Sequence, residues 1–310
     1  MSDSLMSDFK TMMHTPIHIS PRWSWSSPTL LMSDLHLGRG EADLPILERI
    51  ERAAGLGGGG VRIVDSVTDP TQSVASTIVR RVVLVGDLFD FNLGYRETVF
   101  RRHLPLLFCL ERLRRAGVEV IVFTGNHDPD PSPVLSEELG VCVVTEPTPV
   151  ELYGRLVLIE HGDLLEPRWS KRALCELVRR RWVRALARLV PPALTWRLTG
   201  QYIETDKRDS SRMHVNDDHT PLEPLIRTRW SALNAQGYHH WVFGHFHQAI
   251  AWTPLREDCG DSTVYVLGEQ TKLKTCLYWD DQGPRLCIPA QTNEHESRRC
   301  PDLSLRIYRG

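Results

Sequence analysis

Residues 29–36 have the sequence TLLMSDLH, a short apolar run followed at once by an aspartate and a histidine. Short apolar runs that end in polar residues predict buried strands. The pattern recurs along the chain, at Thr29–Ser33, Val82–Val85, Val118–Phe123, Leu156–Ile159 and His240–Phe243. Because helical patterns alternate with some of these runs, we expect an α/β layered fold, with functional groups on the loops at the carboxyl ends of its strands.

The helical patterns lie at Leu44–Ala54 and Glu97–Ala116. After the fifth run, short strands separated by polar turns are expected at Val264–Leu267, Thr275–Trp279 and Leu303–Tyr308. These strands would be the last ones of a sheet.

Two segments do not follow this pattern. Residues 1–28 lack a clear period, and we expect an irregular tail there. Residues 55–80 include the glycine run Gly57–Gly60, but no Gly-Lys-Ser/Thr follows it. We therefore interpret this segment as a surface insertion and not as a phosphate-binding loop.

The composition is that of a globular protein. Of the 310 residues, 41% are hydrophobic and 25% are charged, which excludes global disorder. The formal net charge of −2 excludes a uniformly basic surface for nucleic acid. No apolar run reaches the roughly 18 residues of a membrane-spanning helix, and the first residues do not form a signal peptide. Seven scattered cysteines without a C-x-x-C pair favour reduced thiols, so we expect a cytoplasmic protein.

Each of the five expected strands ends in residue types that bind metals. The five segments are Ser33-Asp34-Leu35-His36, Gly86-Asp87-Leu88-Phe89-Asp90, Gly125-Asn126-His127-Asp128, Glu160-His161-Gly162-Asp163 and Gly244-His245-Phe246-His247. Asp34 and His36 are two residues apart, so in extended chain their side chains point to the same side and can converge on one ion. The same argument applies to His245 and His247. The neighbouring glycines allow tight turns and close backbone approach.

This combination of ligand types favours a centre of two metal ions. Imidazole, carboxylate and amide oxygen together suit Mn, Fe or Zn. Seven ligands are too many for one catalytic ion, but they suit two ions that share a carboxylate and lie about 3.5–4 Å apart, as in enzymes that displace a phosphoryl group. A lone histidine near a strand is more often structural, and an Asn-His-Asp triplet can be a turn. Five such segments in this order favour the metal site.

The five segments resemble the motifs of the calcineurin-like metallophosphoesterases, from about Leu31 to His247. The fold of that family is two β-sheets packed face to face with helices outside. The resemblance therefore implies an α/β, four-layer metallophosphoesterase sandwich over residues 29–310. It also implies a helical cap insertion at about residues 168–215.

The resemblance also implies a role for each residue of the site. The implied ligands are Asp34, His36 and His247 for one divalent metal, Asn126, His161 and His245 for the other, and Asp87 for both, with Mn favoured over Fe or Zn. His127 is the implied catalytic histidine, which stabilises charge on the phosphoryl group and can protonate the leaving group. Asp128 is its implied orienting partner. Asp90 either orients a ligand or caps the following helix. The role of Asp163 is open in the same way.

The fourth segment narrows the choice of substrate. Residues 150–163 are similar to the corresponding stretch of UDP-2,3-diacylglucosamine hydrolases, bacterial enzymes of lipid A biosynthesis that release UMP and a lipid monophosphate. Those enzymes also carry a helical cap after this segment. However, they usually have arginine where this chain has His127, the general form of the superfamily. Another phosphatase, phosphodiesterase or nuclease is therefore the alternative, and a non-catalytic scaffold is less favoured because all the candidate ligands are present.

The insertion is basic and amphipathic. Residues 168–200 carry nine basic side chains and one acidic one, a local charge of +8 against −10 for the rest. The apolar residues between them are Trp169, Leu174, Leu177, Val178, Trp182, Leu186, Leu189 and Val190. This pattern favours a cap, or peripheral contact with the inner face of the membrane, over a surface helix that packs its apolar side on the core. No nucleic acid partner is expected. Lys207, Arg208 and Arg212 either reach substrate phosphates or form a solvated loop.

Overall fold

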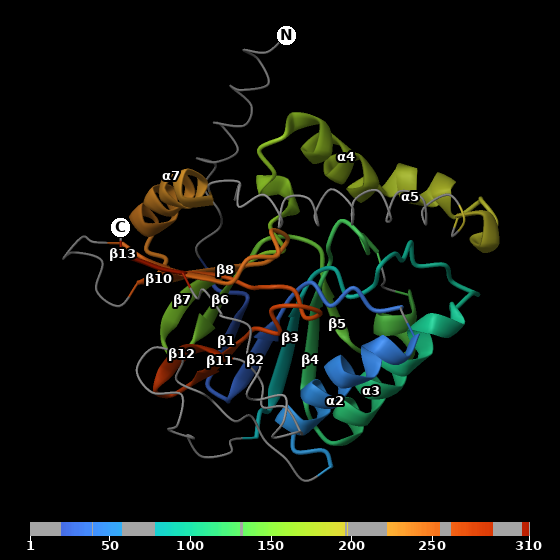
Figure 1. Ribbon diagram of the computed structural model, residues 1–310, viewed down its shortest axis with the longest axis horizontal. Coiled ribbons are helices and arrows are strands. Elements are labelled where there is room, and N and C mark those ends of the chain that lie inside the picture. Colours follow the sequence, from blue (N-terminus) through green and yellow to red (C-terminus); the bar gives the residue numbers. More distant parts are fainter. Residues whose placement is uncertain are drawn as a thin grey trace.

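The computed structural model describes residues 20–38, 40–57, 78–130, 133–195, 197, 222–254, 262–287 and 306–309. Two β-sheets pack face to face, and helices cover their outer faces (Figure 1). The expected four-layer α/β sandwich is confirmed.

The first sheet has six strands in the order β12-β11-β2-β3-β4-β5. Their bounds are β2 Thr29–Met32, β3 Arg81–Val85, β4 Glu119–Phe123, β5 Cys142–Val144, β11 Cys276–Asp280 and β12 Gly283–Cys287. Strands β2 to β5 are parallel, and β11 and β12 join antiparallel at one edge. The carboxyl ends of β2, β3 and β4 therefore lie at the same edge of the sheet.

The second sheet has seven strands in the order β1-β6-β7-β8-β10-β9-β13. Their bounds are β1 Trp23–Trp25, β6 Thr148–Leu152, β7 Arg155–Ile159, β8 His240–Phe243, β9 Ile250–Thr253, β10 Thr263–Val266 and β13 Arg306–Arg309. Strands β7, β8 and β10 are mutually parallel.

Successive side chains of the central strands point to opposite faces of the first sheet, and both faces are buried. In β2, Leu31 faces the core between the sheets, whereas Leu30 and Met32 pack in the core under α2 (Leu44–Ala53) and α3 (Leu104–Arg115). Val82 to Val85 alternate in the same way. Helix α7 (Leu222–Ala235) covers the outer face of the second sheet with Ile226, Trp230 and Leu233. Because β2 and β3 are buried on both sides, they have the continuous apolar sequence of central strands.

The remaining helices are short or belong to the insertion. They are η1 Gly40–Asp43, η2 Arg101–His103, the π-helical turn η3 Pro133–Glu138, η4 Asp163–Leu165, α4 Trp169–Arg179 and α5 Arg181–Ala187. Helices α4 and α5 lie beyond the strand ends, at the top of Figure 1. Within the described part of the chain, no helix is both long and apolar enough to span a bilayer.

The sequence predicted the central elements and misplaced some others. All five strand runs and the first helix are confirmed, as are strands β10, β11 and β13. The second helix begins at Leu104 and not at Glu97, since Pro105 occupies the first turn, where no backbone N–H is needed. The expected tail is wrong at Trp23–Trp25, which pairs with β6. Residues 58–77 of the expected surface insertion lie outside the described residues.

Several elements had no prediction. Strands β1 and β5 are only three residues long, too short for a periodic signal. Strands β6, β9 and β12 also had no prediction. The described cysteines are all free.

The core between the sheets gives a stability prediction. Leu277 in β11 is fully buried there, opposite Leu31. We expect Leu277→Ala to lower the free energy of unfolding by about 2–5 kcal/mol, because it removes buried methyl groups and leaves a cavity. Urea denaturation measures this change. The control Leu44→Ala removes a half-exposed side chain and should change the free energy by less than about 0.5 kcal/mol; equal effects would contradict the assigned core.

Candidate metal centre

The five metal-binding segments meet at one place in the fold. They follow β2, β3 and β4 of one sheet and β7 and β8 of the other, and these strands end on the same side of the sandwich. Three overlapping groups of side chains result. They are Asp34, His36 and His247; His36, Asp87 and His127; and Asp87, His161 and His245. In each group the ligand atoms lie within 4.8 Å of one another.

The backbone at this place has a left-handed conformation at five non-glycine residues. Their φ angles are 53° at Asp34, 47° at His36, 50° at Asp87, 68° at His245 and 53° at His247. Each such residue costs on the order of 1–3 kcal/mol. The expectation that each pair two residues apart lies in extended chain is therefore wrong. His245 and His247 consequently turn to different groups of ligands.

The carboxylate of Asp128 holds two of these loops in shape. It accepts backbone N–H groups from Asp87 at 3.2 Å, Leu88 at 2.6 Å, Phe89 at 3.2 Å and Gly125 at 2.9 Å. It does not orient His127 as expected. The ring Nδ1 of His127 instead hydrogen bonds to the backbone oxygen of Asp90, at 2.8 Å. Asp128 therefore positions the loop that carries Asp87.

Close packing at the site requires glycine at position 125. A Cβ atom there would lie 2.0 Å from Oδ1 of Asp87, an atom that also accepts the backbone N–H of His127 at 2.9 Å. The expected close backbone approach is present at this glycine. The candidate bridging carboxylate could not occupy its place beside any larger residue.

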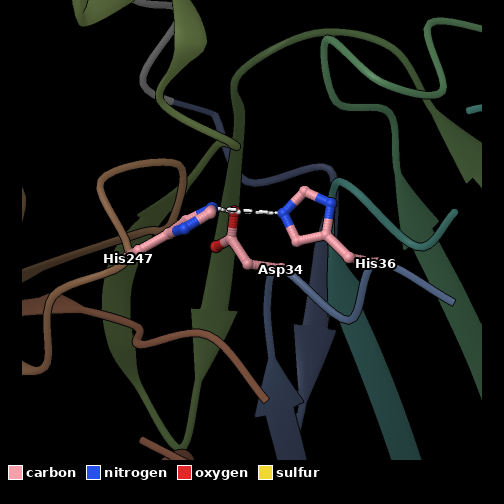
Figure 2. A group of neighbouring side chains, drawn as sticks. All are labelled: Asp34, His36 and His247. Carbon is pink, nitrogen blue, oxygen red and sulfur yellow. Dashed lines mark hydrogen bonds and ion pairs between the residues drawn. The ribbon is translucent and has the colours of Figure 1, made fainter. Parts of the chain in front are cut away.

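The first group consists of Asp34, His36 and His247, and Figure 2 shows both imidazole rings directed toward the space beside the carboxylate. Nε2 of His247 lies 3.3 Å from Oδ1 of Asp34 and 3.1 Å from Nε2 of His36. Oδ1 of Asp34 is buried and accepts no hydrogen bond from the described residues. A buried carboxylate oxygen without a donor, beside two converging imidazole nitrogens, fits a cation.

The set Asp87, His161 and His245 is joined by Asn126, and these four residues are called the second group from here on. Nε2 of His161 lies 3.3 Å from Oδ2 of Asp87 and 3.3 Å from Oδ1 of Asn126. Nδ1 of His245 lies 3.0 Å from the same Asn126 oxygen. Oδ2 of Asp87 also lies 3.9 Å from Nε2 of His36, in the first group. The Asp87 carboxylate thus lies between the two groups, where a shared ligand is needed.

The nitrogen of each histidine that faces away from the centre has an acceptor nearby. The acceptors are Asp90 Oδ1 at 3.8 Å for His36, Asp90 O at 2.8 Å for His127, Val85 O at 2.9 Å for His161, Glu166 Oε2 at 3.8 Å for His245 and Glu269 Oε2 at 3.8 Å for His247. Such partners fix the ring orientation and, in the four candidate ligands, favour the tautomer whose inner nitrogen is free to bind a metal. No helix begins near Asp90, so of its two interpretations the helix cap is wrong.

Glu166 and Glu269 were not predicted from the sequence. Glu269 follows the strand run at residues 264–267 with a glycine between, as Asp87 follows Val85. The same pattern of strand, glycine and acid could therefore have found it. Glu166 follows the short turn η4 and not a strand, so no such signal was available.

Electrostatics at the centre favours ionised carboxylates. Burial alone would raise the pKa of Asp34, but His247 outweighs it and lowers the pKa to about 2. Burial lowers the pKa of His36 to about 3, with help from the nearby His127. Asp34 and His36 are therefore in the protonation states that bind metals. Burial alone would lower the pKa of His247, but its contacts with Asp34 outweigh burial and raise it, so this ring must release a proton when it binds a metal.

Five arginines of the insertion form ion pairs, and three of them, Arg179, Arg184 and Arg188, fasten it to the domain. Arg168 pairs with Glu166, Arg172 with Glu176, Arg179 with Asp163, and both Arg184 and Arg188 with Asp130. These five positive charges are thus paired with acidic side chains of the protein itself. Lys207, Arg208 and Arg212 lie outside the described residues.

The apolar side chains of the insertion are the exposed ones. Those at least 40% exposed are Trp169, Leu174, Leu177, Trp182, Leu186, Leu189 and Leu194. Helix α5 buries no side chain at all. The alternative of an ordinary surface helix, with its apolar side packed on the core, does not describe these residues.

Glu269 gives a prediction for metal binding. We expect Glu269→Gln to weaken Mn²⁺ affinity by about 10–100-fold, because the ring of His247 loses its charged partner. Calorimetric titration of the metal-free protein with Mn²⁺ measures this. As a control, Glu223→Gln changes an exposed glutamate of α7 that pairs with Arg227 and should leave the affinity unchanged. Unchanged affinity in Glu269→Gln would contradict its orienting role.

Comparison with known proteins finds similarity over most of the chain. No protein-family model matches. Several relatives are named UDP-2,3-diacylglucosamine hydrolase. The one from Porphyromonas gingivalis is 27% identical, and the match covers 65% of this chain and 80% of the relative. The one from Nitrosococcus oceani is 26% identical, and the match covers 82% of this chain and 92% of the relative. The relative in Pseudomonas fluorescens is 26% identical over 84% of this chain and 96% of its own length.

One solved structure is similar at a low level. It is a conserved uncharacterized protein from Streptococcus pneumoniae, described as a predicted phosphoesterase, with a TM-score of 0.37, 13% identity, and coverage of 86% of this chain and 94% of that chain. The sequence relatives carry the argument: together with the clustered histidine and aspartate side chains, they support a metallophosphoesterase family for this chain.

Proposed function

We propose that this protein is a two-metal phosphoester hydrolase that cleaves the diphosphate of a UDP-linked diacylglucosamine-type lipid to UMP and a lipid monophosphate. The observation that carries the proposal is the position of Asp87. Its Oδ2 atom lies 3.9 Å from Nε2 of His36 and 3.3 Å from Nε2 of His161, one in each group of ligands. The lipid substrate is inferred from the names of the sequence relatives.

The proposed ligands follow the grouping of the side chains. They are Asp34, His36 and His247 for one divalent metal, Asn126, His161 and His245 for the other, and Asp87 for both, with Mn²⁺ as the favoured ion and Fe or Zn as alternatives. When bound, the metals would supply Lewis acidity toward water and the phosphoryl oxygens. The low pKa of Asp34 and the neutral ring of His36 keep these residues ready to bind a cation.

His127 is the proposed general acid. Its Nδ1 is engaged by the backbone oxygen of Asp90 at 2.8 Å, so Nε2 points toward the centre, 4.0 Å from Oδ2 of Asp87. A proton held at Nε2 can pass to the leaving oxygen, and the charged ring stabilises negative charge on the phosphoryl group. Asp128 has an indirect role, because it holds the backbone of the loop that carries Asp87.

The exposed side chains of α4 and α5 support a lipid as the substrate. Trp169 and Trp182 are more than 60% exposed and Leu189 is 79% exposed, beside arginines that are already paired. We propose that apolar contacts, more than charge, hold the acyl chains and allow peripheral contact with the inner face of the cell membrane from the cytoplasm.

A phosphoesterase with another substrate is the second candidate. His127 favours it, because the UDP-2,3-diacylglucosamine hydrolases usually have arginine at that position. A nuclease is the least favoured of these, since several arginines of the insertion are already paired with acidic side chains of the protein itself. A non-catalytic scaffold would not need the complete set of ligands.

UMP release tests the proposed reaction. We expect the purified protein with Mn²⁺ to release UMP from UDP-2,3-diacylglucosamine, and Asp87→Ala to lower the rate by more than about 100-fold, because the shared ligand is lost. Chromatography of the nucleotide product measures this. The matched control, Asp281→Ala, changes an exposed turn residue and should retain the rate. Cleavage of simple phosphodiesters without release of UMP would contradict the proposed lipid substrate but would agree with the proposed hydrolase activity.

The role of the exposed apolar residues has a separate test. We expect the double variant Trp182→Ser and Leu189→Ser to lower the rate on the lipid substrate by about 10-fold or more, because two buried apolar contacts are worth at least about 1.4 kcal/mol. Its rate on bis(p-nitrophenyl) phosphate should not change. The control Phe108→Ser alters an exposed apolar residue on α3, far from the insertion in Figure 1. A parallel loss on both substrates would argue against lipid contact.

A further inference from the structure

Arg179, the last residue of α4, makes an unusually complete set of contacts. Its guanidinium pairs with Asp163 through Nε to Oδ2 and Nη2 to Oδ1, both at 2.8 Å. Nη2 also donates to the backbone oxygen of Thr124 at 3.1 Å. Nη1 donates to the backbone oxygen of Thr145 at 3.1 Å and to Oγ1 of Thr124 at 3.3 Å. All five N–H donors of the guanidinium are thus engaged.

These partners lie beside two candidate ligands of one metal. Thr124 is two residues before Asn126, and Asp163 is two residues after His161. Nε2 of His161 and Oδ1 of Asn126 are 3.3 Å apart. The backbone oxygen of Thr124 and the carboxylate of Asp163 are held by the same nitrogen of Arg179. The arginine therefore ties the two loops together on the outer side of the centre.

Arg179 also lies at the joint of the insertion. Helix α4 ends there, Arg180 is extended with φ −69° and ψ 127°, and α5 begins at Arg181. The backbone oxygen of Arg179 accepts a hydrogen bond from Arg184, whose side chain also pairs with Asp130. A shift of α4 relative to the sheets would therefore pull directly on the guanidinium.

We propose that Arg179 is a positioning residue that couples the α4–α5 insertion to the metal held by Asn126, His161 and His245. The inference rests on the proposed metal centre and adds a link between the insertion and one of its two ions. Docking of α4 locks the Thr124 and Asp163 loops at the separation that this metal needs. The fork of the guanidinium is essential, since an ammonium group cannot span a carboxylate and two backbone oxygens at once.

Metal titration of the whole chain tests this coupling. In the unmodified protein we expect two Mn²⁺ ions to bind, with the electron paramagnetic resonance signal of a coupled pair. In Arg179→Met we expect one ion to bind about 10–100-fold more weakly while the other keeps its affinity. Arg179→Lys, a milder change that retains the charge, should show the same one-sided loss.

The control breaks another attachment of the same insertion. Tyr95→Phe removes the contacts of the Tyr95 hydroxyl with the backbone oxygen of Val190 at 3.0 Å and with Oγ1 of Thr195 at 2.7 Å, and Tyr95 lies eight residues beyond Asp87, the candidate ligand nearest to it in sequence. We expect it to lower the melting temperature but to leave both Mn²⁺ affinities unchanged.

The outcomes separate the possibilities. Equal Mn²⁺ affinities in Arg179→Met and the unmodified protein, whatever the melting temperature, would overturn the coupling, and so would full rescue by Arg179→Lys. An equal loss in Tyr95→Phe would show that any loosening of the insertion suffices, which also contradicts the specific role. An unmodified protein that binds no pair of Mn²⁺ ions would overturn the proposed metal centre itself.

Discussion

The carboxylate of Asp87 is the interaction on which the rest of the site depends. Its Oδ1 atom accepts the backbone N–H of His127 at 2.9 Å, and its Oδ2 atom faces the histidines of both ligand groups. Asp128 lies behind it as a second buried carboxylate and is held by four backbone N–H groups. Burial and the charge of Asp87 raise the pKa of Asp128 to about 7. Cations at the centre would relieve this repulsion.

The fold supplies the rigidity that this arrangement needs. Five non-glycine residues at the centre have positive φ angles, and strained turns persist only where the surroundings fix them. Here parallel strands buried on both faces bring the loops to one edge, and Asp128, Gly125 and the outer partners of the histidines hold them. Stability of the sandwich and geometry of the site are therefore linked, while the exposed apolar helices of the insertion contribute little to the core.

The apolar runs predicted an α/β layered fold, and the family resemblance implied its two-sheet sandwich. The candidate ligands lie together because each closely follows an apolar strand. It could not predict the turns at Asp34 and His245, because non-glycine residues with positive φ have no compositional signal. The partners of Asp128 and Arg179 were missed for a different reason: both side chains bind backbone groups that are distant in sequence. A sum of charges over residues 168–200 likewise counted arginines that pair inside the fold.

The central claim is that Asp87 lies between two metal ions, and crystallography of the Mn²⁺-loaded protein tests it most directly. Anomalous difference maps recorded at the manganese edge should show two peaks about 3.5–4 Å apart on either side of the Asp87 carboxylate. One peak would lie among Asp34, His36 and His247 and the other among Asn126, His161 and His245. A single peak, or peaks that do not contact Asp87, would contradict the account.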